Sequence, residues 1–252
     1  MRIVSLAPSV TSILLSLGVR RELVGVSRWC KDVAAVGSRP AVGDCWKMDV
    51  REVMRLRPTI LIGSVPFAAE TVQKILAEPV AFLAINPRSL ADIYNDIRIL
   101  GRVVGRRRAA ERLIRNIRDG FVEVASRARM LGGSRRRVRV YCEAWPKPRI
   151  SSPPWVAELV EMAGGKMIVE AGARVSDSDV ALAAPELIVL AWAATGARAK
   201  VAMALRNPAW REVPAIRNGR VVVIRDELLN TPGPPLVRGA RELARAIRES
   251  AC

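Results

Sequence analysis

Four of the six tryptophans lie where an α/β protein places its ligands. Trp29, Trp145 and Trp192 each follow a predicted strand, and Trp46 lies in the loop before a predicted helix. Ligands of open α/β sheets bind beyond the carboxyl ends of the strands, and binding clefts are lined mainly by apolar and aromatic side chains. We therefore predict that these four rings line a cleft for a large, planar or partly apolar ligand. Each ring taken singly fits ordinary packing equally well.

The other two tryptophans and two nearby acids receive a different interpretation. Trp155, on a predicted helix, and Trp210, in a short turn, are expected in the core. Asp44 and Glu143 each stand two residues before a tryptophan of the first group, so either carboxylate could bond to a ligand. A solvated loop acid is the favoured reading of both, because acidic side chains are rarely buried.

Hydroxyl groups near strand ends complete the predicted site. Residues 2–18 predict a strand, a tight loop and a helix, with Ser9 as the N-cap and with Ser9 and Thr11 facing the cleft. Thr231 lies in the proline-rich segment 230–234, which either closes one side of the cleft or only turns the chain. The predicted ligand-binding residues are therefore Ser9, Trp29, Trp46, Trp145, Trp192 and Thr231.

The types of residue present exclude several kinds of enzyme. The chain has no histidine, and Ser-His-Asp hydrolysis, Cys-His proteolysis, HExxH zinc chemistry and histidine-ligated haem all need one. The cysteines lack the CxxC spacing of metal or redox sites, and free or buried thiols are favoured over a Cys30–Cys45 bridge. We predict no enzyme, no catalytic residue, no metal site and no intrinsic cofactor.

Hydrophobic periodicity indicates the elements that must position these residues. Predicted strands cover residues 22–27, 59–63 and 79–85, and predicted helices cover 49–57, 68–77, 89–104 and 106–131. The last third repeats this layout with a strand at 138–143, a loop at 146–154 and a helix at 155–163. Residues 176–190 also parallel 49–62, because each is a short helix that ends before a proline and leads into a buried strand.

This alternation predicts an α/β fold of two Rossmann-like lobes with parallel-rich sheets. One long backbone helix joins the lobes, and the ligand cleft lies between them. The predicted N-terminal lobe covers residues 1–88, the connecting helices cover 89–133, and the C-terminal lobe covers 134–252.

Positive charge is concentrated in the middle of the chain. The net charge is +17, and residues 88–139 contain fifteen arginines and five acidic residues. Such a stripe could meet an anionic membrane, a nucleic acid or an acidic partner. A solvated helix face in an arginine-rich protein is favoured, and no nucleic-acid partner is expected because aromatic residues do not interleave the stripe.

Several segments together resemble the class III periplasmic solute-binding proteins, the helical-backbone group, in their cobalamin-binding branch. The resemblance covers nearly the whole chain and is specific at residues 2–9, 23–27, 143–146, 218–221 and 231–237. It implies two rigid lobes on a backbone helix, with a corrin ring held by aromatic side chains. Trp29 matches a family aromatic contact, and Trp46 lies one position from another.

The chain also departs from the family pattern. The two surface glutamates with which family members dock on an importer would fall near Arg51 and Ser178. Glu52 and Asp179 are adjacent but would point about 100° away on a helix. No signal sequence precedes the first strand, so the expected location is cytoplasmic as written, or extracytoplasmic if a leader has been omitted.

The predicted function is non-catalytic capture of a corrinoid, a cobalamin-like ligand, for an ABC-type uptake system. The expected partners are this small molecule and an importer permease, and the protein is expected to be a monomer. Ferric siderophore and haem are the alternative ligands, with Tyr94, Tyr141 and the cysteines as the only plausible axial ligands for haem. A second alternative is a cytosolic corrinoid-binding or salvage protein with no importer.

Overall fold

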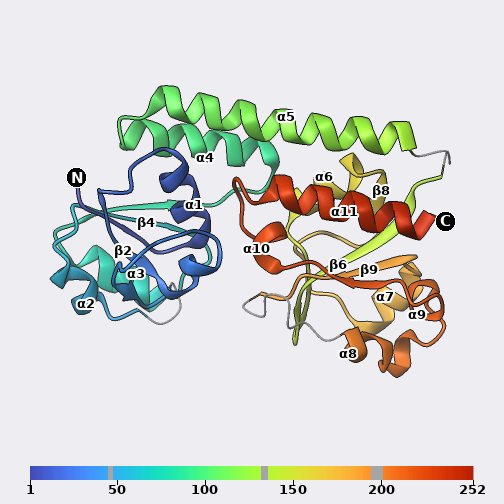
Figure 1. Ribbon diagram of the computed structural model, residues 1–252. Helices are drawn as coiled ribbons and strands as arrows, with labels where there is room; N and C mark the ends of the chain where they lie inside the picture. The colour runs from blue at the N-terminus through green and yellow to red at the C-terminus, as the bar shows by residue number, and fades with distance from the viewer. Residues whose placement is uncertain (45–47, 132–135, 194–200, 252) are drawn as a thin grey trace. The chain divides into compact units, whose positions relative to one another are not determined.

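The computed structural model describes residues 1–44, 48–131, 136–193 and 201–251 (Figure 1). By their internal contacts the residues form two compact units. The N-terminal unit contains Met1–Pro87, Ala91–Asn116 and Pro232–Pro234, and the C-terminal unit contains Arg88–Leu90, Ile117–Thr231 and Pro235–Cys252. The long helix α5 (Arg107–Leu131) belongs to both units, since it passes from one to the other near its tenth residue.

The N-terminal unit is built on a five-stranded parallel sheet with the order β3-β2-β1-β4-β5. Its strands are β1 (Ile3–Ser5), β2 (Leu23–Ser27), β3 (Ala41–Val42), β4 (Ile60–Ser64) and β5 (Ala81–Ile85). The central strand β1 lies between β2 and β4, with Val4 opposite Leu61. Because the chain leaves β1 on one side and returns on the other, the sheet has its topological switch point at the carboxyl end of β1.

Five helical segments accompany this sheet. They are α1 (Pro8–Ser16), the short 3₁₀ helix η1 (Arg28–Asp32), α2 (Val50–Arg55), α3 (Ala69–Leu76) and α4 (Leu90–Val103). A buried cluster joins Val4 and Leu61 of the sheet to Val53 of α2 and Ile75 of α3. The helices α2 and α3 therefore pack on the same face of the sheet, against the side chains of alternate strand residues.

The first helix begins earlier than predicted. Its N-cap is Ala7 and its first turn starts at Pro8, and no side chain caps it. Proline is favoured at this position because its missing N–H is not needed there and its φ angle is already helical. The prediction that Ser9 is the N-cap is therefore wrong, and Ser9 lies buried inside the first turn.

The C-terminal unit contains a second sheet with the order β10-β9-β6-β7, in which β8 also pairs with β6. Its strands are β6 (Val138–Pro146), β7 (Arg149–Ser151), β8 (Gly165–Met167), β9 (Leu187–Leu190) and β10 (Val221–Val223). All pairings are parallel except that of β7 with β6. The loop predicted at 146–154 is wrong in part, because β6 extends to Pro146 and returns as the antiparallel β7.

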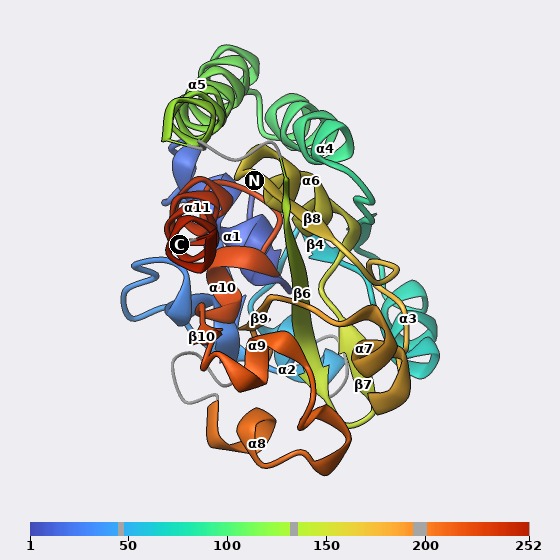
Figure 2. The ribbon, with the colours of Figure 1, turned by 90° about the vertical axis from the view of Figure 1, so that its right-hand side faces the viewer.

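Helices cover both sides of this sheet (Figures 1 and 2). They are α6 (Pro154–Met162), α7 (Asp177–Ala183), α8 (Val201–Leu205), η3 (Pro208–Trp210), α9 (Pro214–Arg217), α10 (Asp226–Leu229) and α11 (Leu236–Ala251). In Figure 1, α6 and α11 lie on one side of the sheet, and α7, α8 and α9 lie on the other. A buried cluster around Tyr141, Ile188 and Trp210 fills the second side.

The second half of α5 packs against α11. Glu123 of α5 accepts a bond from Arg241 of α11 at 2.8 Å. A side chain at Gly120 would bring its Cβ to 2.5 Å from Cγ1 of Val237, so only glycine allows this close approach. Among the described residues, no helix is both long enough and apolar enough to cross a membrane.

The predicted fold class is confirmed: the protein is α/β, with two parallel-rich sheets and one long helix shared by the units. The predicted helix–proline–strand repeat is also present, as α2 with β4 and α7 with β9. The predicted domain boundaries and the predicted cleft between the lobes stay predictions.

Candidate functional site

In the N-terminal unit, η1 is fixed from the inside by Cys30. The Thr11 hydroxyl lies 2.7 Å from Ser5 Oγ and 3.0 Å from Cys30 Sγ, and Ser27 Oγ lies 3.1 Å from the same sulfur. All four side chains are buried. This small network ties the ends of β1 and β2 to each other and determines where the residues before Cys30 must lie.

The side chain of Trp29, the residue before Cys30, is held by Asp44. The indole Nε1 donates a hydrogen bond to Asp44 Oδ2 at 3.1 Å. Arg28 Nε donates to the same oxygen at 3.1 Å, and its guanidinium carbon lies 5.0 Å from the centroid of the Trp29 ring. Asp44 is only 5% exposed, whereas the Arg28 side chain is 55% exposed and Trp29 is half-buried. One face of Trp29 is therefore covered by a cation, and its only polar atom is bonded.

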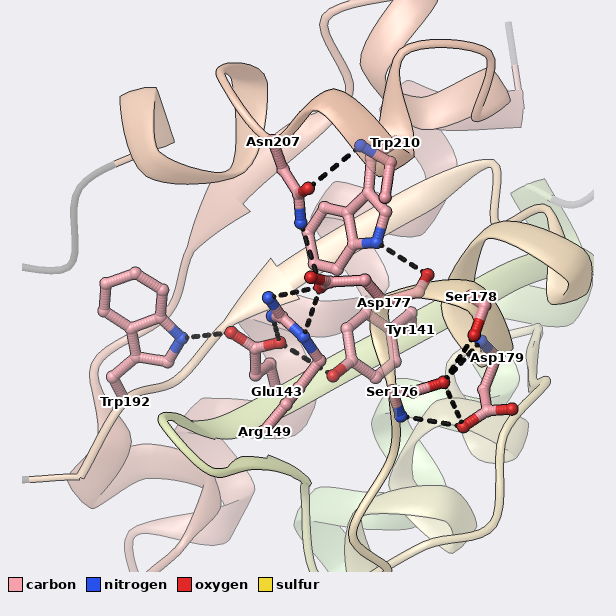
Figure 3. A network of polar contacts seen from close by, with 11 residues as sticks. Tyr141, Glu143, Arg149, Ser176, Asp177, Ser178, Asp179, Trp192, Asn207 and Trp210 are labelled. Atoms are coloured by element: carbon pink, nitrogen blue, oxygen red, sulfur yellow. Dashed lines mark hydrogen bonds and ion pairs between the residues drawn. The ribbon is translucent and has the colours of Figure 1, made fainter.

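In the C-terminal unit, Glu143 is the centre of a larger network (Figure 3). Its carboxylate accepts from the Tyr141 hydroxyl at 2.7 Å and from Trp192 Nε1 at 2.8 Å, and it forms an ion pair with Arg149. Glu143 is 0% exposed, so all of its partners come from protein groups. Each bond is charge-assisted, which makes it stronger than a bond between neutral groups.

Arg149 extends this network to α7 and η3. Its Nη2 lies 2.7 Å from Asp177 Oδ1, and its guanidinium carbon lies 4.3 Å from the centroid of the Trp210 ring. Asn207 Nδ2 also donates to Asp177 Oδ1 at 2.9 Å, and Trp210 Nε1 donates to the Asp177 carbonyl at 3.1 Å. The turn at the carboxyl end of β6 is thus joined rigidly to the helical side of the unit.

The protonation states in this network follow from burial and charge. Burial, followed by the charge of Glu143, raises the pKa of Tyr141 well above its usual range, so its hydroxyl stays a donor. Burial lowers the pKa of Arg149, but Glu143 and Asp177 more than offset this, and the net direction is upward. Arg149 therefore stays cationic at neutral pH.

This arrangement suits binding rather than catalysis. Both Asp44 and Glu143 are occupied by an arginine and an indole, so neither is placed to act as an acid or base on a bound molecule. Among the residues that the structure describes, no group of three or more His, Cys, Asp or Glu side chains is placed to hold a metal ion. What the two carboxylates do is fix tryptophan rings.

The structure places the predicted site residues in different environments. Trp145 is 40% exposed and its Nε1 donates to the Lys147 carbonyl at 2.8 Å. Trp192 is 6% exposed and packs in the core cluster of the C-terminal unit. Ser9 and Thr231 are also buried, and Trp46 lies outside the described residues. Among the described residues, Trp29, which is half-buried, and Trp145 are thus the predicted contacts that are not buried.

Some predictions about individual residues were wrong and others are confirmed. Thr11 does not face a cleft, since it is fully buried against Ser5 and Cys30. Asp44 and Glu143 are not solvated loop acids but buried network centres. Trp155 and Trp210 lie in the core as predicted.

The cysteine prediction is confirmed where it can be followed. Cys30 and Cys142 are free and buried, and Cys45 lies outside the described residues. Burial raises the pKa of the Cys30 thiol, and it raises the pKa of the Cys142 thiol to about 12.

Sequence reasoning missed Arg149. A signal for it was present, because Glu143 ends a predicted strand, and a carboxylate that is buried at such a position requires a cationic partner. Arg149 is the nearest arginine after the turn that ends this strand.

Two α/β units that share one long helix, with tryptophan rings fixed at strand ends, are the architecture that the resemblance to solute-binding proteins predicts. The chain matches the family model for periplasmic binding proteins over residues 3–228. It belongs to this family, whose members are in general not enzymes.

Three comparisons illustrate the similarity. An uncharacterized ABC transporter substrate-binding lipoprotein, YvrC from Bacillus subtilis, is 25% identical over 98% of this chain and 79% of its own length. The vitamin B12-binding protein of Vibrio parahaemolyticus is 22% identical, over 92% of this chain and 84% of its own. The apo structure of the periplasmic heme-binding protein RhuT from Roseiflexus sp. RS-1 has a TM-score of 0.85 at 23% identity and covers 100% of this chain and 99% of its own.

Proposed function

We propose that this protein is the substrate-binding component of an ABC-type uptake system and that it captures a corrinoid. The observation that carries the proposal is the Trp29 ring, whose N–H is bonded to Asp44 and whose one face is covered by Arg28. Only apolar surface of this ring remains for a ligand, which suits a large, flat molecule. The naming of two relatives as an ABC substrate-binding and a vitamin B12-binding protein supports the same function.

Trp145 is the second proposed contact, because its exposed ring lies near the carboxyl end of a strand in the other unit. Ser9, Trp46, Trp192 and Thr231 remain predicted contacts. The corrinoid is the bound ligand, and the proposal includes no intrinsic cofactor.

The side chains present favour a corrinoid over haem. A haem carrier normally supplies an axial ligand to iron, and this chain has no histidine. Tyr141 is buried with its hydroxyl bonded to Glu143. Cys30 and Cys142 are buried thiols whose raised pKa disfavours the thiolate that binds iron. A cobalamin brings its own axial groups and requires only shape and rim contacts.

Haem binding is the second candidate, and the similarity of fold to a heme-binding protein favours it. Tyr94, half-buried on α4, would be its candidate axial ligand. Ferric siderophores are a third class, for which the excess of arginine would attract an anionic chelate.

An importer permease is the proposed protein partner, and the proposed location is extracytoplasmic, in keeping with the lipoprotein relative. The predicted docking positions carry little negative charge that could act in docking. Asp179 closes a capping box with Ser176, whose backbone N lies 2.7 Å from Asp179 Oδ2. Arg51 and Glu52 are exposed side by side on α2. Docking on a permease would then involve contacts other than a pair of glutamates.

Isothermal titration calorimetry with three probes tests the choice of ligand. Cyanocobalamin, haemin and a ferric hydroxamate siderophore are titrated separately into the full chain at pH 7.5. We expect saturable one-to-one binding of cyanocobalamin that is at least tenfold tighter than binding of the other two. Saturation by haemin together with no heat from cyanocobalamin up to high micromolar concentration would replace the first candidate by the second. Trp29→Phe should weaken the binding of cyanocobalamin. Trp155→Phe, which changes a tryptophan in the core, is its matched control and should not weaken binding.

A further inference from the structure

The two units contain the same three-residue arrangement, although their sequences differ around it. In each, a tryptophan at the end of a strand donates its indole N–H to a buried carboxylate. An arginine pairs with the same carboxylate. The two sets are Trp29, Asp44 and Arg28 in the N-terminal unit, and Trp192, Glu143 and Arg149 in the C-terminal unit.

We infer that Asp44 is a positioning residue for ligand binding, and that it acts through the Trp29 ring. This inference rests on the proposed function, in which the Trp29 ring contacts the ligand. Asp44 itself is buried and already bonded to Arg28 and Trp29. Its contribution to affinity is therefore to hold the indole in the orientation that the ligand requires.

Physical reasons support a measurable effect. A half-buried tryptophan on a short 3₁₀ helix can adopt several rotamers, and immobilising it when the ligand binds lowers the affinity. The bond to Asp44 fixes the ring before binding. The bond is charge-assisted and has little competition from water, because Asp44 is 5% exposed.

Arg28 determines which face of the ring the ligand meets. Its guanidinium carbon lies 5.0 Å from the ring centroid, and the same guanidinium is tied to Asp44. The ligand is thus directed to the opposite face. Arg28, Trp29 and Asp44 form a one-sided aromatic platform.

The equivalent set in the C-terminal unit shows the same chemistry in a different setting. Trp192 is 6% exposed and packs among core residues, whereas Trp29 is only half-buried. Loss of the Glu143 bond should therefore affect mainly the stability of the fold. Loss of the Asp44 bond should affect mainly ligand affinity.

A double-mutant cycle tests this inference. Wild type, Asp44→Ala, Trp29→Phe and the double variant are titrated with cyanocobalamin, and with haemin if only haemin binds the wild type. We expect Asp44→Ala to raise Kd about five- to twentyfold in the wild-type background and less than twofold in the Trp29→Phe background, because phenylalanine has no N–H for Asp44 to bind. Asp49→Ala is the matched control, since it removes one charge and one side-chain bond from the same unit. It should change Kd by less than twofold.

A second measurement needs no ligand. The indole ¹H–¹⁵N resonance of Trp29, identified by its loss in Trp29→Phe, should shift in Asp44→Ala, and its proton should exchange with water at least fivefold faster. Asp49→Ala should leave the resonance in place. If Asp44→Ala folds poorly, Asp44→Asn retains an acceptor oxygen and should give an intermediate shift.

The outcomes separate the two proposals. If the wild type binds none of the probes, the proposed function fails, and the resonance still decides whether Asp44 holds the ring. If the wild type binds and Asp44→Ala weakens binding equally in both backgrounds, the positioning role is wrong. An unmoved Trp29 resonance in Asp44→Ala also overturns it.

Discussion

Glu143 and Arg149 form an ion pair at the carboxyl end of β6, in which the Glu143 side chain is 0% and the Arg149 side chain 17% exposed. Removal of only one member of a buried ion pair is costly, because it leaves the other charge out of water and without a partner. The pair also holds Tyr141 and Trp192 through the same carboxylate.

Removal of one partner should therefore be strongly destabilising. We expect Arg149→Met to lower the free energy of unfolding by about 3–5 kcal/mol, because it leaves Glu143 buried without its cation. Urea denaturation followed by circular dichroism measures this. Lys74→Ala, which breaks an exposed pair with Glu70, is the control and should cost less than about 1 kcal/mol.

The double variant Glu143→Gln/Arg149→Met should recover part of this loss, since no buried charge then lacks a partner. If the loss in the double variant equals the sum of the losses in Glu143→Gln and Arg149→Met, the account is contradicted.

Asp96 predicts a dependence of stability on pH. Burial, followed by the charge of Asp92, raises the pKa of Asp96 to about 6 in the folded protein, and its Oδ2 is buried without a hydrogen-bond partner among the described residues. The folded state therefore favours the protonated carboxyl. Wild type should lose stability relative to Asp96→Asn as pH rises from about 4 to above 6.

At pH 7 we expect Asp96→Asn to be more stable by about 1–2 kcal/mol, a figure reduced for screening by solvent. Towards pH 3.5 the difference should become small, because Asp96 is then mostly protonated in both the folded and the unfolded states. Melting temperatures measured from pH 3.5 to 8 test this. A gain that is independent of pH would contradict it.

The packing of α5 on α11 can be tested at Gly120. Alanine favours a helix over glycine by about 1 kcal/mol, but its Cβ would lie 2.5 Å from Cγ1 of Val237. We expect Gly120→Ala to be destabilising by about 1–2 kcal/mol, because overpacking outweighs the gain in helix propensity. In a Val237→Ala background the same change should be neutral or stabilising. Equal effects in both backgrounds would show that the clash is absent.

The thiols of Cys30 and Cys142 should be unreactive in the native protein. Burial raises the pKa of both Cys30 and Cys142, and thiolate is the reactive form. In a Cys45→Ser/Cys252→Ser variant at pH 8, Ellman's reagent should label almost no thiol until denaturant is added. Rapid labelling of one thiol in the native protein would mean that one of these sites opens.

Much of the fold could be predicted from the sequence because its elements are regular. Apolar runs such as residues 187–190 and the helix–proline–strand repeat depend on local patterns, and these follow from propensity and periodicity. The strands β3 and β8, with two and three residues, carry too little pattern to be predicted.

The candidate site was harder to predict because burial is a property of the whole unit. The positions of Asp44 and Glu143 beside tryptophans were evident from the sequence, but their partners Arg28 and Arg149 come into contact through folding. Whether Trp192 packs in the core or offers its ring to solvent depends on Val180, Ala204 and other distant residues.

The central claim is that this protein captures a corrinoid, and the ligand that it retains tests this most directly. The protein is purified gently from its native source without added ligand, and native mass spectrometry is combined with metal analysis of the same sample. We predict a one-to-one complex that contains cobalt and whose amount falls sharply in Trp29→Phe but not in Trp155→Phe. Iron in place of cobalt, or a corrinoid retained equally by Trp29→Phe, would contradict the account.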